Sequence, residues 1–134
     1  MIPALAYLID TNIAIHARDG TEAVLDSLER HSGEILMSAL SLAELQRGLY
    51  RHPAFTAIRE ARLEVLLRGL PVVPFDANAA IAYGRIIARC GWAKGRDYDR
   101  MIAAHAISTN SILVTANESD FRDIPGLSLE NWTI

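Results

Sequence analysis

Short apolar runs alternate with helical patterns along the whole chain, and this alternation is what most constrains the fold. Runs of this length, bounded by polar residues, are typical of buried strands. They occupy residues 4–9, 34–37, 71–75 and 111–114, with a last extended segment over 127–134. Strands that alternate with helices predict an α/β fold with a mostly parallel central sheet flanked by helices. The chain has 134 residues, so we expect a single domain over residues 1–134.

Helix-capping and helix-breaking residues predict where the helices lie between these strands. The first helix is expected over 11–18, and the next follows Thr21. A third begins at Ser38 or Ser41, and a fourth runs from about residue 53 to 68. Asp76 is expected to cap a fifth helix, and the last helix runs over about 97–110.

The composition excludes several classes of protein. A hydrophobic content of 51% and a charged content of 22% exclude a disordered chain and a coiled-coil rod. Cys90 is the only cysteine, so the chain has no internal disulfide. No apolar run reaches the roughly 18 residues that a membrane span needs, and the N-terminus lacks the basic start of a signal peptide. We therefore expect a cytoplasmic protein without membrane association.

The net charge bears on the choice of partner. A formal charge of −3 by itself argues against a nucleic-acid-binding protein, which is usually basic. Twelve of the basic residues are arginines, because Lys94 is the only lysine. Arginine suits bidentate contact with phosphate, but compositional bias of the genome explains the same excess.

Acidic residues follow the predicted strands at three places. Asp10 ends the first strand, and the polar turn 115–120 follows the fourth. Ser38 ends the second strand and leads into a helix that carries Glu44. Because ligands of parallel sheets bind at the carboxyl ends of the strands, we expect these three places to meet.

The helix that begins near Asp97 carries two acids on different faces. Asp99 falls within the apolar arc, whereas Asp97 lies nearly opposite, beside His105. A carboxylate on a buried stripe needs a partner or a metal ion, although either acid also suits the start of a helix. We therefore place Asp99 in the candidate site and leave Asp97 outside it.

The remaining acids each have a structural alternative. Ser41 and Glu44 match a capping box, in which Glu44 serves the helix rather than a site. Asp10 can be satisfied by the backbone of its own turn, and Asp120 and Asn117 can be ordinary loop residues. Assembled together, three or four carboxylates stay ionised only around a hard cation such as Mg²⁺ or Mn²⁺. Such a site activates water for phosphodiester hydrolysis.

Other chemistries lack their residues. The sequence has no GxGxxG, GxxxxGK[ST] or GxSxG motif, and its four histidines lack metal-ligand spacing. A phosphatase with an aspartate nucleophile would need a second aspartate two residues after Asp10, where Asn12 stands.

Four motifs in order resemble PIN domains, most closely VapC-type toxins of toxin–antitoxin pairs. They are Leu8-Ile9-Asp10-Thr11-Asn12, Ser41-Leu42-Ala43-Glu44-Leu45 followed by Gly48, Asp99-Arg100-Met101-Ile102-Ala103-Ala104, and Leu113-Val114-Thr115-Ala116-Asn117 through Asp120-Phe121. The tail from Ile124 to Trp132 also resembles that group. The resemblance covers nearly the whole chain.

The resemblance implies a metal-dependent endoribonuclease. Asp10, Glu44, Asp99 and Asp120 would be its catalytic acids, with Asp10 and Asp99 as the direct ligands of Mg²⁺ or Mn²⁺. Thr11, Asn12 and Thr115 would orient these carboxylates, and Asn117 would help or replace Asp120.

It also implies a homodimer that is inhibited by a VapB-type antitoxin. That antitoxin would lie along the helices after Ser38 and would supply the contacts with operator DNA. The alternative is a non-catalytic PIN-like module that binds RNA or a protein without cleaving it.

Candidate phosphate contacts for an RNA substrate are basic residues near these acids, although a solvated helix face explains them equally well. They are Arg47, Arg51, Lys94, Arg96 and Arg100. Setting the four acids aside leaves the rest of the chain slightly positive, which weakens the objection from net charge.

Overall fold

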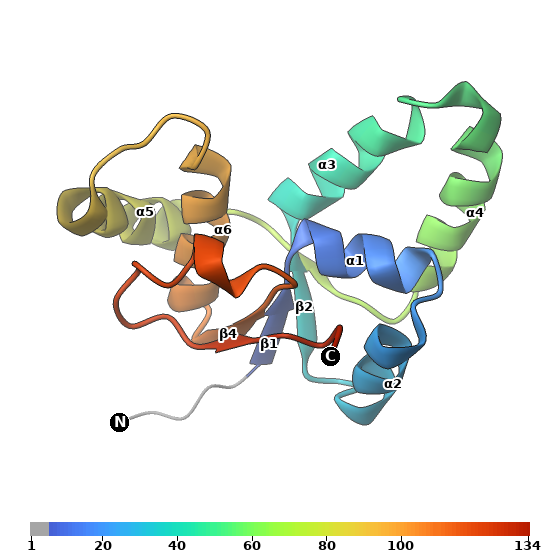
Figure 1. The fold of residues 1–134 in the computed structure, drawn as a ribbon, viewed down its shortest axis with the longest axis horizontal. Helices are drawn as coiled ribbons and strands as arrows, with labels where there is room; N and C mark the ends of the chain where they lie inside the picture. Colours follow the sequence, from blue (N-terminus) through green and yellow to red (C-terminus); the bar gives the residue numbers. More distant parts are fainter. Residues whose placement is uncertain (1–5) are drawn as a thin grey trace.

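A five-stranded parallel sheet forms the centre of the computed structural model, which describes residues 6–134 (Figure 1). The strands are β1 (Ala6–Ile9), β2 (Ile35–Ser38), β3 (Val72–Val73), β4 (Ser111–Val114) and β5 (Leu129–Glu130), in the spatial order β3-β2-β1-β4-β5. All four strand pairs are parallel, which confirms the predicted fold class. Residues 4 and 5 of the predicted first strand lie outside the described residues.

Helices cover both faces of the sheet. They are α1 (Thr11–Arg18), α2 (Glu22–Arg30), α3 (Ala39–Leu49), α4 (Thr56–Leu67), α5 (Ala77–Cys90) and α6 (Asp97–Ser108), with short 3-10 turns η1 (Pro53–Phe55) and η2 (Glu118–Asp120). Figure 1 shows α5 and α6 on one side of the sheet and α1 to α4 on the other. Among the described residues, no helix is long and apolar enough to span a membrane.

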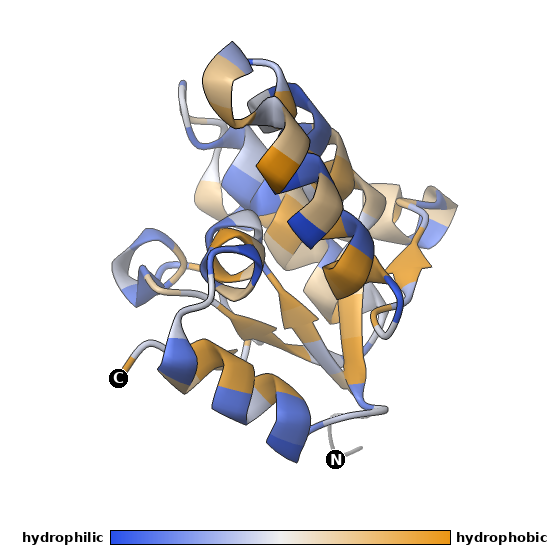
Figure 2. Cartoon of the chain, turned by 90° about the vertical axis from the view of Figure 1, so that its right-hand side faces the viewer, coloured by the Kyte–Doolittle hydropathy of each residue, from blue (hydrophilic) through white to orange (hydrophobic). Residues whose placement is uncertain are grey.

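The strands are apolar on both faces, so they build two separate cores. Leu8 and Leu113 pack with the residues of α5 and α6, whereas Ile9 and Val114 pack with those of α1, α3 and α4. Successive side chains of a strand point to opposite faces, which explains this division. Figure 2 shows the strands as almost continuously hydrophobic and the helices as hydrophobic on one side. Burial on both faces is why these strands read as apolar runs in the sequence.

Polar residues at the carboxyl ends of the strands cap the helices that follow. Asp10 accepts a hydrogen bond from the backbone N–H of Ile13 at 2.9 Å, and Ser38 accepts one from Leu40 at 3.1 Å. Asp76 accepts one from Ala79 at 3.0 Å, as predicted. Each cap satisfies an N–H group that the first turn of a helix leaves free, so a short strand passes directly into a helix.

The structure rules out the capping-box alternative at Ser41 and Glu44. Helix α3 begins at Ala39, and Ser41 lies within it, buried and without a hydrogen-bond partner among the described residues. Ser38 occupies the capping position, because its hydroxyl at the end of β2 accepts a hydrogen bond from the Leu40 N–H group in the first turn of α3. Glu44 is therefore in the second turn, free of any capping role and available to the site.

Candidate active site

Asp10 lies at the carboxyl end of β1, the central strand of the sheet. Its side chain is only 8% exposed, and it receives hydrogen bonds from the Ile13 backbone and the Thr115 hydroxyl. Burial raises the pKa of the Asp10 carboxyl and the charge of Glu44 adds to this, although hydrogen bonds from Ile13, Thr115 and Asn12 work in the opposite direction. The net effect is a raised pKa, because burial outweighs these hydrogen bonds.

Asp99 stands in the first turn of α6, where the charges of all three other predicted acids act on its carboxyl. Burial is the main cause of its raised pKa, followed by the charges of Asp120, Asp10 and Glu44. Arg96 partly offsets them. The fold therefore brings the four predicted acids, which are far apart in the sequence, within electrostatic reach of one another.

The carboxylate of Glu44 in α3 accepts a hydrogen bond from a hydroxyl of α1. The Thr11 Oγ1 atom donates a hydrogen bond to Glu44 Oε1, and the guanidinium of Arg47 lies 3.9 Å from Oε2. The Tyr98 hydroxyl is close by and donates to the carbonyl of Leu40. Burial and the charge of Glu44 raise the pKa of Tyr98, so its hydroxyl stays protonated and acts as a donor.

These groups line one pocket of about 320 Å³. Asp10, Glu44 and Asp99 contribute carboxylates, Ile15, Ile102 and Phe121 contribute apolar surface, and Thr11, Asn12 and Tyr98 contribute polar groups. Arg47 and Arg51 also line it, on the side of α3. The pocket thus combines negative charge with arginines at its edge.

Asp120 is absent from the lining of this pocket and is held in its own loop. Its Oδ2 atom accepts a hydrogen bond of 2.6 Å from Asn117 Nδ2, and Ser119 donates to Asn117 Oδ1 at 3.0 Å. The backbone N–H of Asn117 donates to Thr115 Oγ1 at 3.1 Å. Thr115 and Asn117 therefore link the loop that carries Asp120 to the buried Asp10.

Two neighbours of Asp99 in the sequence stay out of the pocket. The Asp97 carboxylate accepts a hydrogen bond from the Tyr83 hydroxyl of α5. Asp97 therefore faces away from the pocket, as predicted. Arg100, predicted as a phosphate contact, is 4% exposed and pairs with Asp123, so that prediction is wrong. Its position three and four residues before Ala103 and Ala104 places it on the buried stripe of α6.

Tyr98 and Phe121 line the pocket without having been predicted there. An aromatic residue beside an apolar stripe is ordinarily a core residue, so no local signal distinguishes these two. Only their order in the sequence, one residue before Asp99 and one after Asp120, points to the site.

The donor set fits a hard divalent cation. Among residues 6–134, no three side chains of the metal-binding types converge closely enough to enclose an ion by themselves. Asp10 and Asp99, however, line one pocket, both have a raised pKa, and neither forms an ion pair among the described residues. Mg²⁺ is commonly held in this way, by one or two carboxylates with water and substrate phosphate completing the shell.

The structure is an α/β domain with an acidic pocket, edged by arginines, at the carboxyl ends of its parallel strands. The model of the PIN domain family matches residues 7–127, and the chain belongs to this family. It is 33% identical to Ribonuclease VapC2 of Rickettsia felis over 96% of this chain and 98% of that protein. It is also 33% identical to the tRNA(fMet)-specific endonuclease VapC of Salmonella typhimurium, with the same coverage.

Solved structures show the same relationship. The VapBC2 structure of Rickettsia felis, bound to a DNA fragment from its promoter, matches with a TM-score of 0.84 at 32% identity, over 95% of this chain and 98% of that chain. The DNA-bound VapBC of Salmonella typhimurium matches with a TM-score of 0.85 at 32% identity, over 96% and 98%. These relatives confirm the predicted family and the predicted class of function, a VapC-type ribonuclease of a toxin–antitoxin system.

Proposed function

We propose that this chain is the toxin of a VapBC-type pair and hydrolyses RNA with a divalent cation, Mg²⁺ or Mn²⁺, held by Asp10 and Asp99. The observation that carries this proposal is the electrostatic coupling of Asp99 to three other carboxylates, two of which line the same pocket at the end of the sheet. Like charges gathered without a counter-ion cost stability, so their assembly indicates a cationic ligand.

The protein side chains have separate roles in this proposal. A bound cation would supply Lewis-acid chemistry to the scissile phosphate. Glu44 and Asp120 accept protons or hydrogen bonds from water at the two sides of the site. Thr11 holds Glu44, Thr115 holds Asp10, and Asn12 is exposed where it can contact the substrate.

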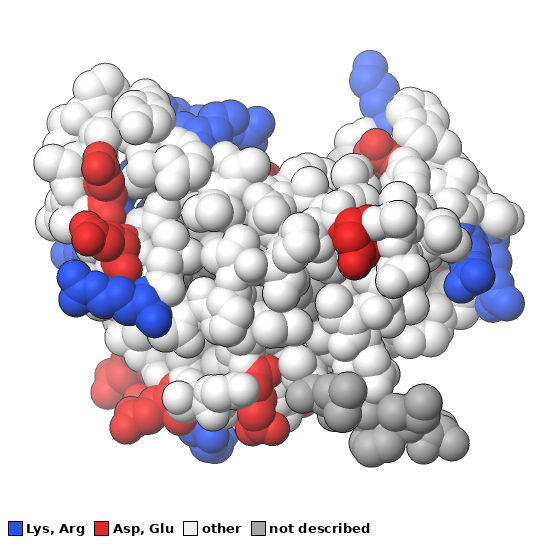
Figure 3. Space-filling view, turned by 180° about the vertical axis from the view of Figure 1, so that it is seen from behind, with Lys and Arg blue, Asp and Glu red and all other residues white. Residues whose placement is uncertain are grey.

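RNA is proposed to enter over α3, where Arg47 and Arg51 contact its phosphates. Both arginines line the pocket and both are exposed. Lys94 and Arg96, in the exposed loop before α6, are available for more distant phosphates. Figure 3, the view from behind Figure 1, shows the charged groups of that face mainly at its margins, with a broad uncharged area between them.

The partner is proposed to be a VapB-type antitoxin that lies along α3 and α4. Tyr50 and Phe55, between these helices, are 67% and 53% exposed and offer apolar surface. The related structures hold VapBC with DNA, which supports a VapB-type partner and contact of such a complex with DNA. We propose that the antitoxin supplies this contact. We further propose a homodimer, supported by the exposed Ile81 and Trp92 on and just beyond α5, working in the cytoplasm where RNA is available.

Substitution of the two proposed metal ligands tests the activity. Asp10→Asn and Asp99→Asn are expected to lower Mg²⁺-dependent RNA cleavage by at least about 100-fold, because each removes one charged ligand. Asp97→Asn is the matched control, since it removes an acid from the same helical turn outside the pocket. Cleavage sites are mapped in total RNA after brief induction.

Two results would contradict the proposal. Parent-like cleavage by both site variants would show that the carboxylates are misassigned. Binding of RNA without any cleavage by the parent chain, at saturating Mg²⁺ or Mn²⁺, would favour the non-catalytic PIN-like module. Growth arrest on expression that is relieved by co-expression of the adjacent antitoxin gene would support the assignment as a toxin.

A further inference from the structure

Arg100 is a buried cation that the proposed chemistry does not use. It lies on α6 directly after Asp99, and its Nη2 atom is 3.0 Å from Asp123 Oδ2. Its Nε–H group has no acceptor among the residues that the structure describes. Burying a guanidinium costs free energy, and the ion pair with the Asp123 carboxylate offsets most of that cost.

Asp123 is held from two helices at once. Its carboxylate pairs with Arg100 of α6, and its backbone carbonyl lies 3.4 Å from the Sγ atom of Cys90 at the end of α5. The flanking Phe121 and Ile124 are buried in the core formed with α5 and α6. The segment that follows η2 is therefore fastened against these helices, with the ion pair as its polar anchor.

We propose that Arg100 and Asp123 form a positioning pair that holds residues 117–123 against α6, so that Asp120 faces Asp99. Each partner is close in the sequence to one of these acids. Arg100 directly follows Asp99 in α6, and Asp123 comes three residues after Asp120. An ion pair between positions 100 and 123 therefore sets the register between the two segments. This inference rests on the proposed function, in which Asp120 is one of the acids.

A further observation supports this role. The hydrogen bonds of η2 do not fix it to α6: the turn is three residues long, and the Asn117–Asp120 hydrogen bond is internal to the loop and exposed. Phe121 and Ile124 supply apolar contact with the core of α5 and α6, and the Arg100–Asp123 pair supplies the ion pair between this segment and α6.

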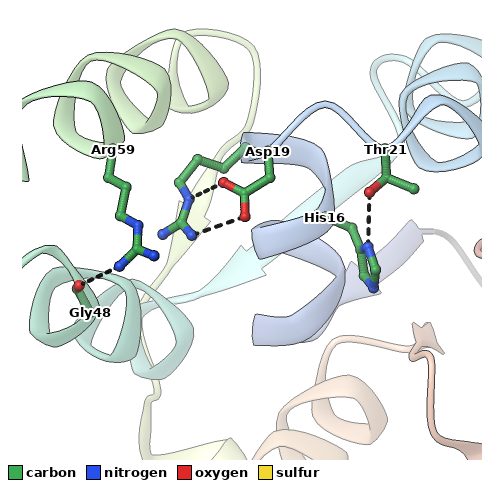
Figure 4. Close-up of polar contacts among 6 residues, drawn as sticks. His16, Asp19, Thr21, Gly48 and Arg59 are labelled. Carbon is green, nitrogen blue, oxygen red and sulfur yellow. Dashed lines mark hydrogen bonds and ion pairs between the residues drawn. The ribbon is translucent and has the colours of Figure 1, made fainter. Parts of the chain in front are cut away.

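The chain contains a matched control for this pair. Arg18 and Asp19 form an ion pair of 2.9 Å whose side chains are 5% and 45% exposed, compared with 5% and 46% for Arg100 and Asp123. This pair lies at the far end of α1, outside the pocket (Figure 4, in which two dashed lines end on Asp19). Asp19→Asn therefore removes an equivalent charge with no connection to Asp120.

The experiment compares Asp123→Asn with Asp19→Asn in cleavage of an RNA oligonucleotide that spans a mapped site. Asp123→Asn should lower kcat about tenfold with KM changed less than about twofold, because a misplaced acid affects the reaction more than binding. In an Asp120→Asn background the same substitution should change kcat less than about twofold, because its effect passes through Asp120. Asp19→Asn should leave kcat unchanged in both backgrounds.

Amide hydrogen exchange supplies a readout that does not need activity. The N–H groups of Asp120 and Phe121 donate to Asn117 and Glu118, so they report on the order of the loop. Asp123→Asn should make them exchange about tenfold faster, whereas Asp19→Asn should not. This measurement separates failure of the pair from failure of the proposed ribonuclease activity.

Each outcome decides the inference. If Asp123→Asn matches Asp19→Asn in kcat or in exchange, the pair does not position the loop. If its full effect on kcat persists in the Asp120→Asn background, it acts on something other than Asp120, and the inference is also overturned. If the parent does not cleave RNA, the proposed function fails, and faster exchange at Asp120 and Phe121 alone would support the anchor.

Discussion

Asp99→Asn should stabilise the metal-free protein while it abolishes the proposed activity. Three carboxylates act on Asp99, and burial raises its pKa as well. Removing this charge therefore relieves repulsion whenever no cation is bound. A residue that serves only the fold would give the opposite result, so the sign of the change distinguishes a site from a structural ion pair.

The size of the effect follows from Coulomb's law. Two charges roughly 8 Å apart interact by roughly 2 kcal/mol at an effective dielectric constant of about 20. The pocket is open to water and salt, so screening reduces the total for Asp99 to about 1 kcal/mol. For a chain of this size that is roughly 4 °C in Tm.

The pH dependence has a definite sign. A carboxyl with a raised folded-state pKa binds more protons in the folded chain, so its stabilising contribution is complete below its ordinary value of 3.8. That contribution is lost as the pH rises through the folded-state pKa. The advantage of Asp99→Asn over the parent should therefore be absent near pH 3.5, where Asp99 is protonated, and should grow toward pH 7.

Urea denaturation with EDTA at low salt, repeated across this pH range, measures the effect. Asp97→Asn is the control, because it weakens the acceptor of the Tyr83 hydroxyl and should not stabilise the chain. Added salt should shrink the advantage of Asp99→Asn. If Asp99→Asn instead lowers the free energy of unfolding at pH 7 as Asp97→Asn does, the argument from carboxylate repulsion is refuted.

Two other predictions concern the cation and the polar core. Mg²⁺ at about 100 times its Kd should raise the free energy of unfolding of the parent by about 2.7 kcal/mol, and by far less in Asp10→Asn, as calorimetry can measure. Ser38→Ala should cost about 3 kcal/mol in urea denaturation, because Ser38 both caps α3 and bonds His105 Nδ1 at 2.8 Å. The Ser108 hydroxyl donates to the carbonyl of His105 in its own helix, so Ser108→Ala should cost less than about 1 kcal/mol.

Part of the site could be predicted from the sequence because its residues obey local rules. Asp10 stands where an apolar run stops, and Asp99 falls on the apolar face of a helix, so one-dimensional patterns single out both. The strand at 111–114 and the cap at Asp76 follow from patterns of the same kind. The family motifs add Glu44 and Asp120, which periodicity alone does not select.

Other features depended on partners that no local pattern names. The choice between Ser38 and Ser41 as a cap was decided by which hydroxyl reaches a free N–H group at the entry of α3. The role of Arg100 depended on Asp123, which is 23 residues away, and that of Tyr98 on Leu40, which is 58 residues away. These are side-chain contacts between elements, and they exist only once the helices have packed.

The sequence by itself therefore determined the alternation of strands and helices, the apolar faces and the acids at the strand ends, because backbone preference and burial act over neighbouring residues. Only the tertiary structure decided the strand order β3-β2-β1-β4-β5 and the meeting of Asp10, Glu44 and Asp99 in one pocket. It also decided that Arg100 faces the core rather than a phosphate. The reason is physical: a charge takes its meaning from the groups within a few ångströms of it, and the fold brings those groups together from distant parts of the chain.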